Sequence, residues 1–198
     1  MTARASIIPF RPRPQRAEKL ISNGVLGMLL FVFVEVMLFA GFISAFLIIK
    51  SRAVGSVWPP PNQPRLPFEE TAVNTSALIA SGIVLLIAHR LYVRGKESVA
   101  VLLAVATVLG GAFVGLQGVE WLALIREGLT LTSSTYGALF YTIIGAHAAH
   151  AVAAIFVLAW AWVRMTRGRL SREAMSTVAL FWYFVVLVWP FLYFQVYL

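Results

Sequence analysis

The sequence predicts an all-α fold, a polytopic membrane bundle of five transmembrane helices, and three observations carry this prediction. Hydrophobic residues make up 60% of the 198 residues and charged residues only 12%. The mean hydropathy is +0.84. The apolar residues fall into five runs that each reach the roughly 20 residues a helix needs to cross a bilayer. A soluble domain of this size has neither so many nor such long apolar runs.

The first apolar run extends from Gly24 to Ile49 and follows a basic segment, residues 1–23, that is interrupted by prolines. Prolines exclude a continuous helix there, so we expect a cytoplasmic tail followed by a membrane domain, residues 24–198. A secretory signal has an apolar region of only about 7–15 residues before its cleavage site. The run is longer than that, and it is predicted to be a retained first span.

Four further spans are predicted at Val73–Val93, Val99–Ile125, Tyr136–Val163 and Ala174–Tyr197. Pro190 lies in the last span, where a membrane helix tolerates it because neighbouring helices can satisfy the freed carbonyl. We nevertheless expect a break near Val188. Between the first two spans, residues 51–72 contain a proline run that favours an extended polyproline conformation. Trp58 in this segment is expected to anchor at the membrane interface.

The basic residues are divided unevenly between the two ends of the predicted spans. Five lie in the N-terminal tail, three in the turn after the second span and four in the turn after the fourth, which is twelve of the sixteen. The positive-inside rule then places the N-terminus in the cytoplasm and the C-terminus in the periplasm. Orientation thus explains the net charge of +8, and we expect no nucleic-acid partner because no basic patch is interleaved with aromatic residues.

A single carboxylate, Glu35, lies in the middle of the first span. A charged group near the bilayer centre costs at least about 2.5 kcal/mol, so Glu35 is expected to face protein or water. Two interpretations stay open. Glu35 is either a proton-handling site or a hydrogen-bonded group that orders helix packing.

Two histidines, His147 and His150, lie three residues apart on one face near the middle of the fourth span. A metal or haem site needs more ligands than these, and the chain has no cysteine or aspartate to supply them. We therefore expect no catalytic, cofactor-binding or metal-binding residues in this chain. The histidines are expected to bond across to another helix, with Glu35 the proposed partner of His147.

The third span carries Gln117 and Glu120 on one face near its outer end. Glu120 is expected to be solvated at the interface, because Trp121 beside it is an interfacial residue type. Small residues recur every four positions in the third and fourth spans, at Gly111, Gly115, Gly145, Ala149 and Ala153. These are expected to let neighbouring helices approach closely.

Five short motifs follow one another along the chain. They are VEVMLFAGF around Glu35, Trp58-Pro59-Pro60, Asn74-Thr75-Ser76 with Ser81-Gly82, Phe113 with Gln117, Glu120 and Trp121, and Tyr136-Gly137 with Phe140 and Gly145 to His150. Together they resemble the motifs of subunit III of the haem-copper oxidases, the cytochrome c and quinol oxidase family. The resemblance covers nearly the whole chain after the N-terminal tail.

The chain departs from this family in its last span. Where the family usually has W-H-F-V-D, this sequence has Tyr183 in place of the histidine and Val186 in place of the aspartate. Five spans are similar to the shorter bacterial form, which lacks the first two of seven helices. In the longer members a lipid-filled cleft separates those two helices from the rest. The resemblance thus implies a bound phospholipid here only where a neighbouring subunit supplies the missing wall.

The resemblance implies a non-catalytic accessory subunit of a respiratory terminal oxidase in the bacterial inner membrane. Such a subunit binds no haem or copper, which are expected in partner subunits. It packs against catalytic subunit I, other oxidase subunits and membrane lipids. It supports proton uptake or oxygen access while the complex, a proton-pumping oxidoreductase, reduces oxygen to water. The resemblance leaves open whether cytochrome c or quinol is the electron donor.

Two other functions stay open at this point. An accessory protein of nitric oxide reductase shares the five-span plan. A free-standing proton or solute transporter using Glu35 and His147 belongs to a different class, and it predicts activity in vesicles that contain this chain alone.

The charge distribution gives a testable topology. A reporter inserted at Gly168 should be cytoplasmic, and a reporter fused after Leu198 should be periplasmic, because twelve of the sixteen basic residues lie on the Gly168 side. Paired alkaline phosphatase and fluorescent-protein fusions measure this. A periplasmic signal at Gly168 would mean that the span count or the orientation is wrong.

Overall fold

The computed structural model describes residues 21–52, 58, 63–64, 66–96 and 99–197. The regular elements among these residues are all helices: α1 (Asn23–Arg52), α2 (Phe68–Val93), α3 (Ala100–Arg126), α4 (Thr135–Thr166), α5 (Arg172–Leu192) and a closing π-helical turn, η1 (Tyr193–Tyr197). Five of them are long and apolar enough to cross a membrane. The predicted all-α fold with five spans is confirmed, and the chain is a multi-pass membrane protein. Most of the predicted tail, residues 1–23, lies outside the described residues.

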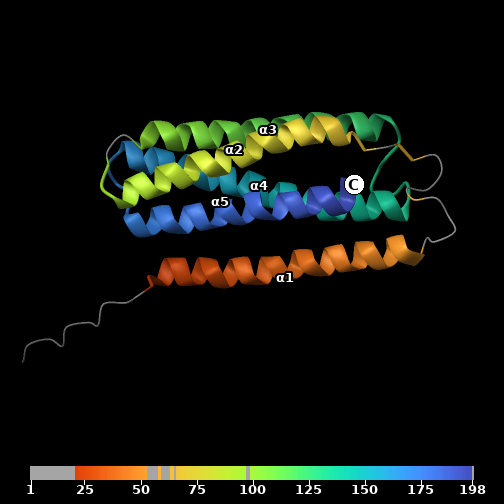
Figure 1. The fold of residues 1–198 in the computed structure, drawn as a ribbon, viewed down its shortest axis with the longest axis horizontal. Helices are drawn as coiled ribbons and strands as arrows, with labels where there is room; N and C mark the ends of the chain where they lie inside the picture. Colours follow the sequence, from red (N-terminus) through yellow and green to blue (C-terminus); the bar gives the residue numbers. More distant parts are fainter. Residues whose placement is uncertain (1–20, 53–57, 59–62, 65, 97–98, 198) are drawn as a thin grey trace, which may run out of the picture.

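The helices run lengthwise beside one another, and α2 to α5 form a four-helix bundle (Figure 1). Helix α1 lies along one side of this bundle (Figure 1) and contacts mainly α5, with fewer contacts to α4. Only 11% of the apolar stretch of α1 is buried inside the chain, against 44% for α2 and for α5. The first span is therefore the least enclosed of the five.

Helix α2 begins earlier than predicted, at Phe68 rather than Val73. Its first turn carries Glu69 and Glu70, whose negative charges stabilise a helix N-terminus. The hydroxyl oxygen of Thr71 lies 2.8 Å from the carbonyl oxygen of Pro67. The extended segment predicted for residues 51–72 therefore ends before Phe68, and most of its remainder lies outside the described residues.

The predicted break near Val188 is wrong. Helix α5 continues through Pro190 to Leu192 and widens only afterwards, into η1. The backbone N–H of Tyr193 donates to the carbonyls of Trp189 and Pro190, so hydrogen bonding resumes directly after the proline. This agrees with the tolerance of membrane helices for proline inside a packed bundle.

The closest approach of helices occurs at glycines other than those predicted. A Cβ atom added to Gly110 would lie 2.5 Å from the Trp182 ring, and one added to Gly82 would lie 2.9 Å from the Val186 side chain. An added Cβ at Gly111 would meet nothing within 4 Å. The predicted register on α3 was therefore wrong.

The other predicted small-residue positions behave in the same way. An added Cβ at Gly115 would also meet nothing within 4 Å, and Gly145 makes only ordinary contact with Trp121, at 3.9 Å. On α4, Ala149 and Ala153 are exposed, whereas their neighbours Ala151 and Ala154 are buried. The helix packs through a face rotated from the predicted one.

Trp182 links three helices at the point where its ring packs against Gly110. The indole N–H of Trp182 on α5 donates to the hydroxyl of Ser81 on α2 at 3.1 Å. That hydroxyl donates to the carbonyl of Ala106 on α3 at 2.7 Å. Trp182 is completely buried, and Gly110 leaves the space for its ring.

This packing predicts that Gly110→Ala destabilises the bundle. The added methyl overlaps the Trp182 ring, and overpacking of a buried site typically costs about 1–3 kcal/mol. Thermal unfolding of the detergent-solubilised chain, followed by circular dichroism, should show a lowered Tm. Gly111→Ala is the matched control and should leave the Tm unchanged or slightly raised, because alanine favours helix and no atom lies within reach. Equal melting of both variants would contradict the packing described for Gly110.

Candidate functional site

The mid-membrane carboxylate Glu35 pairs with His150. Its Oε2 lies 3.0 Å from the Nε2 atom of His150, and the side chains are 14% and 18% exposed respectively. The pair therefore links α1 to α4. Glu35 contacts a histidine of another helix, as predicted, but the predicted partner, His147, was wrong.

The hydrogen bonds of His150 fix where its proton lies. Nδ1 is 2.8 Å from the carbonyl oxygen of Ala146, which can only accept, so Nδ1 carries the hydrogen. Nε2 then faces Glu35 Oε2 either as a neutral acceptor beside a protonated carboxyl group or as part of an ion pair. Either arrangement leaves the pair without net charge, which lowers the cost of placing it in hydrocarbon.

Aromatic rings surround this pair. The ring of Phe39 lies 5.6 Å from that of His150, and the ring of Phe184 lies 5.8 Å from it, both nearly edge-to-face. Phe31, one helical turn before Glu35, meets Phe181 edge-to-face at 5.7 Å. Rings from α1 and α5 therefore cover much of the pair with apolar surface.

His147 lies inside the bundle, and its ring also meets that of Phe39 on α1 at 6.3 Å. It is 1% exposed, and its ring lies 5.0 Å from that of Trp189 with an angle of 32° between the planes. Neither ring nitrogen has a hydrogen-bond partner among the described residues. Positions three apart on a helix differ by about 60° in direction, which is enough to separate the surroundings of His147 from those of His150.

A second polar cluster lies where α2, α3 and η1 meet. The side-chain nitrogen of Gln117 donates to the carboxylate of Glu120 at 2.7 Å and to the hydroxyl of Tyr197 at 3.2 Å. The hydroxyl of Thr71 donates to the same carboxylate at 2.8 Å, and Asn74 donates to the Gln117 oxygen at 3.3 Å. Glu120 was predicted to be solvated at the interface; it is partly exposed, and the early start of α2 also brings Thr71 against it.

Trp58 packs against two helices of the bundle. Its ring meets Phe46 of α1 edge-to-face at 5.8 Å and Tyr136 of α4 at 5.4 Å. The residue is half-buried. Trp58 therefore links α1 to α4, and its position at the membrane interface stays a prediction.

Tyr183 and Val186, the two residues that depart from the family motif in the last span, make contacts that the sequence did not predict. The hydroxyl of Tyr183 lies 3.3 Å from Nδ1 of His89, and Nε2 of His89 lies 3.1 Å from the hydroxyl of Ser176. Val186 packs against Gly82. The pairing of a tyrosine with a histidine near the end of α2 gave no local signal in the sequence, because the two lie 94 positions apart.

Metal-ligating side chains do not gather in the described part of the chain. No group of three or more histidine, cysteine, aspartate or glutamate side chains there could hold a metal ion. The Glu35–His150 pair brings together only two candidate ligands. That the chain binds no haem or copper stays a prediction.

Comparisons with known proteins identify the family to which the sequence is similar. The family described as cytochrome c oxidase subunit III matches residues 16–198. Cytochrome c oxidase subunit 3 of Arabidopsis thaliana is 34% identical, and that of Triticum aestivum is 33% identical, each over 86% of this chain and 66% of the relative. The protein of the same name from Gadus morhua is 33% identical over 86% of this chain and 67% of its own length. The chain thus spans about two thirds of the length of these relatives.

The Glu35–His150 bond predicts different outcomes for two substitutions. Glu35→Ala leaves His150 without its partner and should lower stability by roughly 1–2 kcal/mol, the upper range for hydrogen bonds between membrane helices. Glu35→Gln can still bond to Nε2 and should lose much less. Thermal unfolding of the purified chain measures both, with Met37→Ala as the control, since that side chain is 61% exposed on the same helix.

A double-mutant cycle gives the decisive test. Combining Glu35→Ala with His150→Ala should cost less than the sum of the two single losses, because each removes the same bond. Strict additivity would contradict a direct interaction between these side chains.

Proposed function

The chain belongs to the cytochrome c oxidase subunit III family, and from this we propose that it is a non-catalytic accessory subunit of a respiratory haem-copper terminal oxidase. It packs against catalytic subunit I and supports proton uptake or oxygen access during the reduction of oxygen to water. Partner subunits hold the haems and copper. The chain lies in the bacterial inner membrane with its N-terminus in the cytoplasm, an orientation that the distribution of basic residues supports.

The observation that best supports this proposal is the exposed face of α1. Large apolar side chains cover it, including Phe33 at 64%, Leu30 at 61% and Met37 at 61% exposure. Glu35 lies on the same helix, bonded to His150 in the bundle. A helix fastened on one side and apolar on the other suits a subunit that meets lipid or a larger partner within the membrane.

The polar groups inside the spans favour this function over free-standing transport. The Glu35–His150 pair lies between α1 and α4, whereas the cluster around Gln117 lies between α2, α3 and η1. Buried apolar residues, Phe39, Phe113 and Trp189 among them, lie between these two groups. A transporter would need a continuous polar path through this region, and such a path would have to cross these rings.

Glu35 contributes chiefly by fastening α1 to the bundle. The alternative role is proton exchange through the Glu35–His150 pair. The two roles differ in one measurement: Glu35→Gln preserves the bond but cannot release a proton. A structural role predicts oxygen consumption by the Glu35→Gln complex that follows pH as the wild-type complex does, with unchanged subunit stoichiometry.

Co-purification tests the proposal directly. The affinity-tagged chain, isolated from native membranes in mild detergent, should bring with it a subunit whose reduced-minus-oxidised spectrum shows haem. The same chain expressed alone should contain no stoichiometric haem or copper, because its ligand set is too small. A chain that purifies alone from native membranes and transports protons in vesicles would contradict the proposal.

A further inference from the structure

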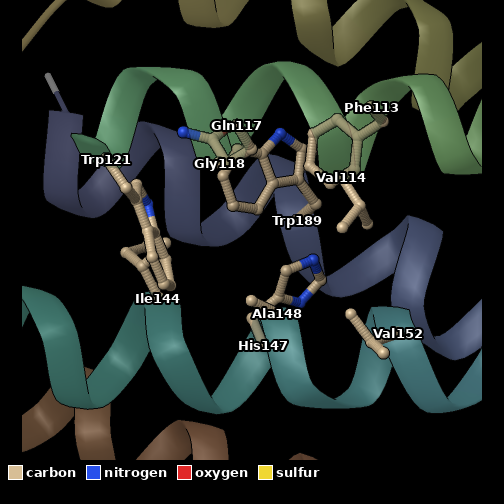
Figure 2. A pocket seen from close by; sticks show the side chains of 10 residues that line it. All are labelled: Phe113, Val114, Gln117, Gly118, Trp121, Ile144, His147, Ala148, Val152 and Trp189. Carbon is tan, nitrogen blue, oxygen red and sulfur yellow. The ribbon is translucent and has the colours of Figure 1, made fainter. Parts of the chain in front are cut away.

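A pocket of about 200 Å³ lies between α3, α4 and α5, and His147 lines it. Figure 2 shows the imidazole of His147 rising from α4 towards the side chains of α3 and α5, with Trp121 to one side and Trp189 above it. Gln117 and Phe113 of α3 line the same space. The pocket is separate from the Glu35–His150 pair.

Two polar side chains in this pocket lack partners. His147 is 1% exposed, and both of its ring nitrogens are buried without a hydrogen bond among the described residues. The indole nitrogen of Trp121 is also buried and without a partner. An unpaired buried polar group costs about 1–3 kcal/mol, so both groups favour a bound molecule that can hydrogen-bond to them.

The rest of the wall is aromatic and apolar. The rings of Phe113 and Trp189 meet edge-to-face at 4.9 Å, and the imidazole of His147 lies against Trp189 at 5.0 Å. Aromatic side chains in the pocket wall favour a planar ring as ligand, since aromatic pairs stack or meet edge to face at such distances. A cavity of about 150 Å³ accommodates benzene, so 200 Å³ leaves room for a substituent.

The pocket opens between α3 and α4. A Cβ added at Gly118 would meet nothing within 4 Å, and Val152 on the facing helix is 39% exposed. Both residues line the pocket. A molecule dissolved in the bilayer can therefore enter from the side, without passing through the aqueous phase.

We propose that this pocket binds a planar six-membered ring that carries a hydroxyl or carbonyl oxygen and is dissolved in the bilayer. The oxygen accepts from the indole N–H of Trp121, and a hydroxyl also donates to a nitrogen of His147. Water alone fits less well, because a mostly apolar cavity of this size stays dry. An acyl chain would fill the space but leave both polar groups unpaired. The proposal does not depend on the accessory-subunit function.

The test uses a pair of probes that differ by one hydroxyl group. Binding of 4-fluorophenol and of fluorobenzene to the full-length chain in lipid nanodiscs is measured by ¹⁹F NMR, with empty nanodiscs to subtract partitioning into lipid. We expect 4-fluorophenol to bind about fivefold more tightly than fluorobenzene, the gain of one net hydrogen bond. Equal binding of the two would overturn the proposal and indicate an apolar cavity that acyl chains can enter.

Substitutions locate the binding. Gly118→Leu fills the pocket and should abolish saturable binding of both probes. Gly111→Leu is the matched control on the same helix, because its added side chain also meets open space, and binding should persist. His147→Phe keeps an aromatic ring but removes both nitrogens, so it should reduce the preference for 4-fluorophenol and retain fluorobenzene binding.

Each remaining result also decides the matter. Binding that survives Gly118→Leu, or a preference that His147→Phe leaves undiminished, would overturn the proposed site. If Gly118→Leu does not fold, Trp121→Phe replaces it as the test of the polar contacts, since that change keeps an aromatic ring in the wall and removes the indole N–H donor. A preference undiminished by Trp121→Phe and His147→Phe together would likewise contradict the proposal.

Discussion

The absence of water from the hydrocarbon layer is the constraint on which this structure depends. Lipid tails are as apolar as leucine, so burial of apolar surface does not draw membrane helices together as it does in water. Helix association then rests on close packing and on polar groups that bond across helices. The contact of Trp182 with Gly110 and Ser81 combines both effects at one position, since the ring fills the space that the glycine leaves and its N–H meets the serine hydroxyl.

The same constraint explains how α1 is attached. Its apolar residues gain little by leaving lipid, so specific contacts must hold it to the bundle. Phe39 and Phe46 are its two buried side chains, and the Glu35–His150 bond lies one helical turn before Phe39. At the N-terminal end of α1, the backbone N–H of Gly24 donates to the carboxylate of Glu173 at 3.3 Å. The helix is thus fixed by polar contacts at its start and middle and by aromatic rings along its length.

The sequence predicts the spans well and their packing poorly, for a physical reason. Whether a segment can cross a bilayer depends on its own length and hydropathy, so all five helices were identified and only their ends differed. Which face of a helix packs depends on partners far along the chain. Gly110 rather than Gly111 is the contact because Trp182 projects towards it, and nothing near Gly110 in the sequence reports that. The same reason explains why Glu35 contacts His150 and not the predicted His147: the sequence does not show which face of α4 is turned towards α1.

The replacements in the last span change where polar contacts lie. With Val186 against Gly82, the contact between α2 and α5 at that depth is apolar. Polar contacts between these two helices lie elsewhere: Trp182 bonds to Ser81, and Tyr183 contacts His89 close to the end of α2, where side chains can reach the interface. Among the described residues, Glu35 is then the carboxylate that stands in the middle of a span, and no second acid nearby can take over its bond. A chain with this arrangement depends more heavily on the Glu35–His150 pair than one that also carries an acid in its last helix.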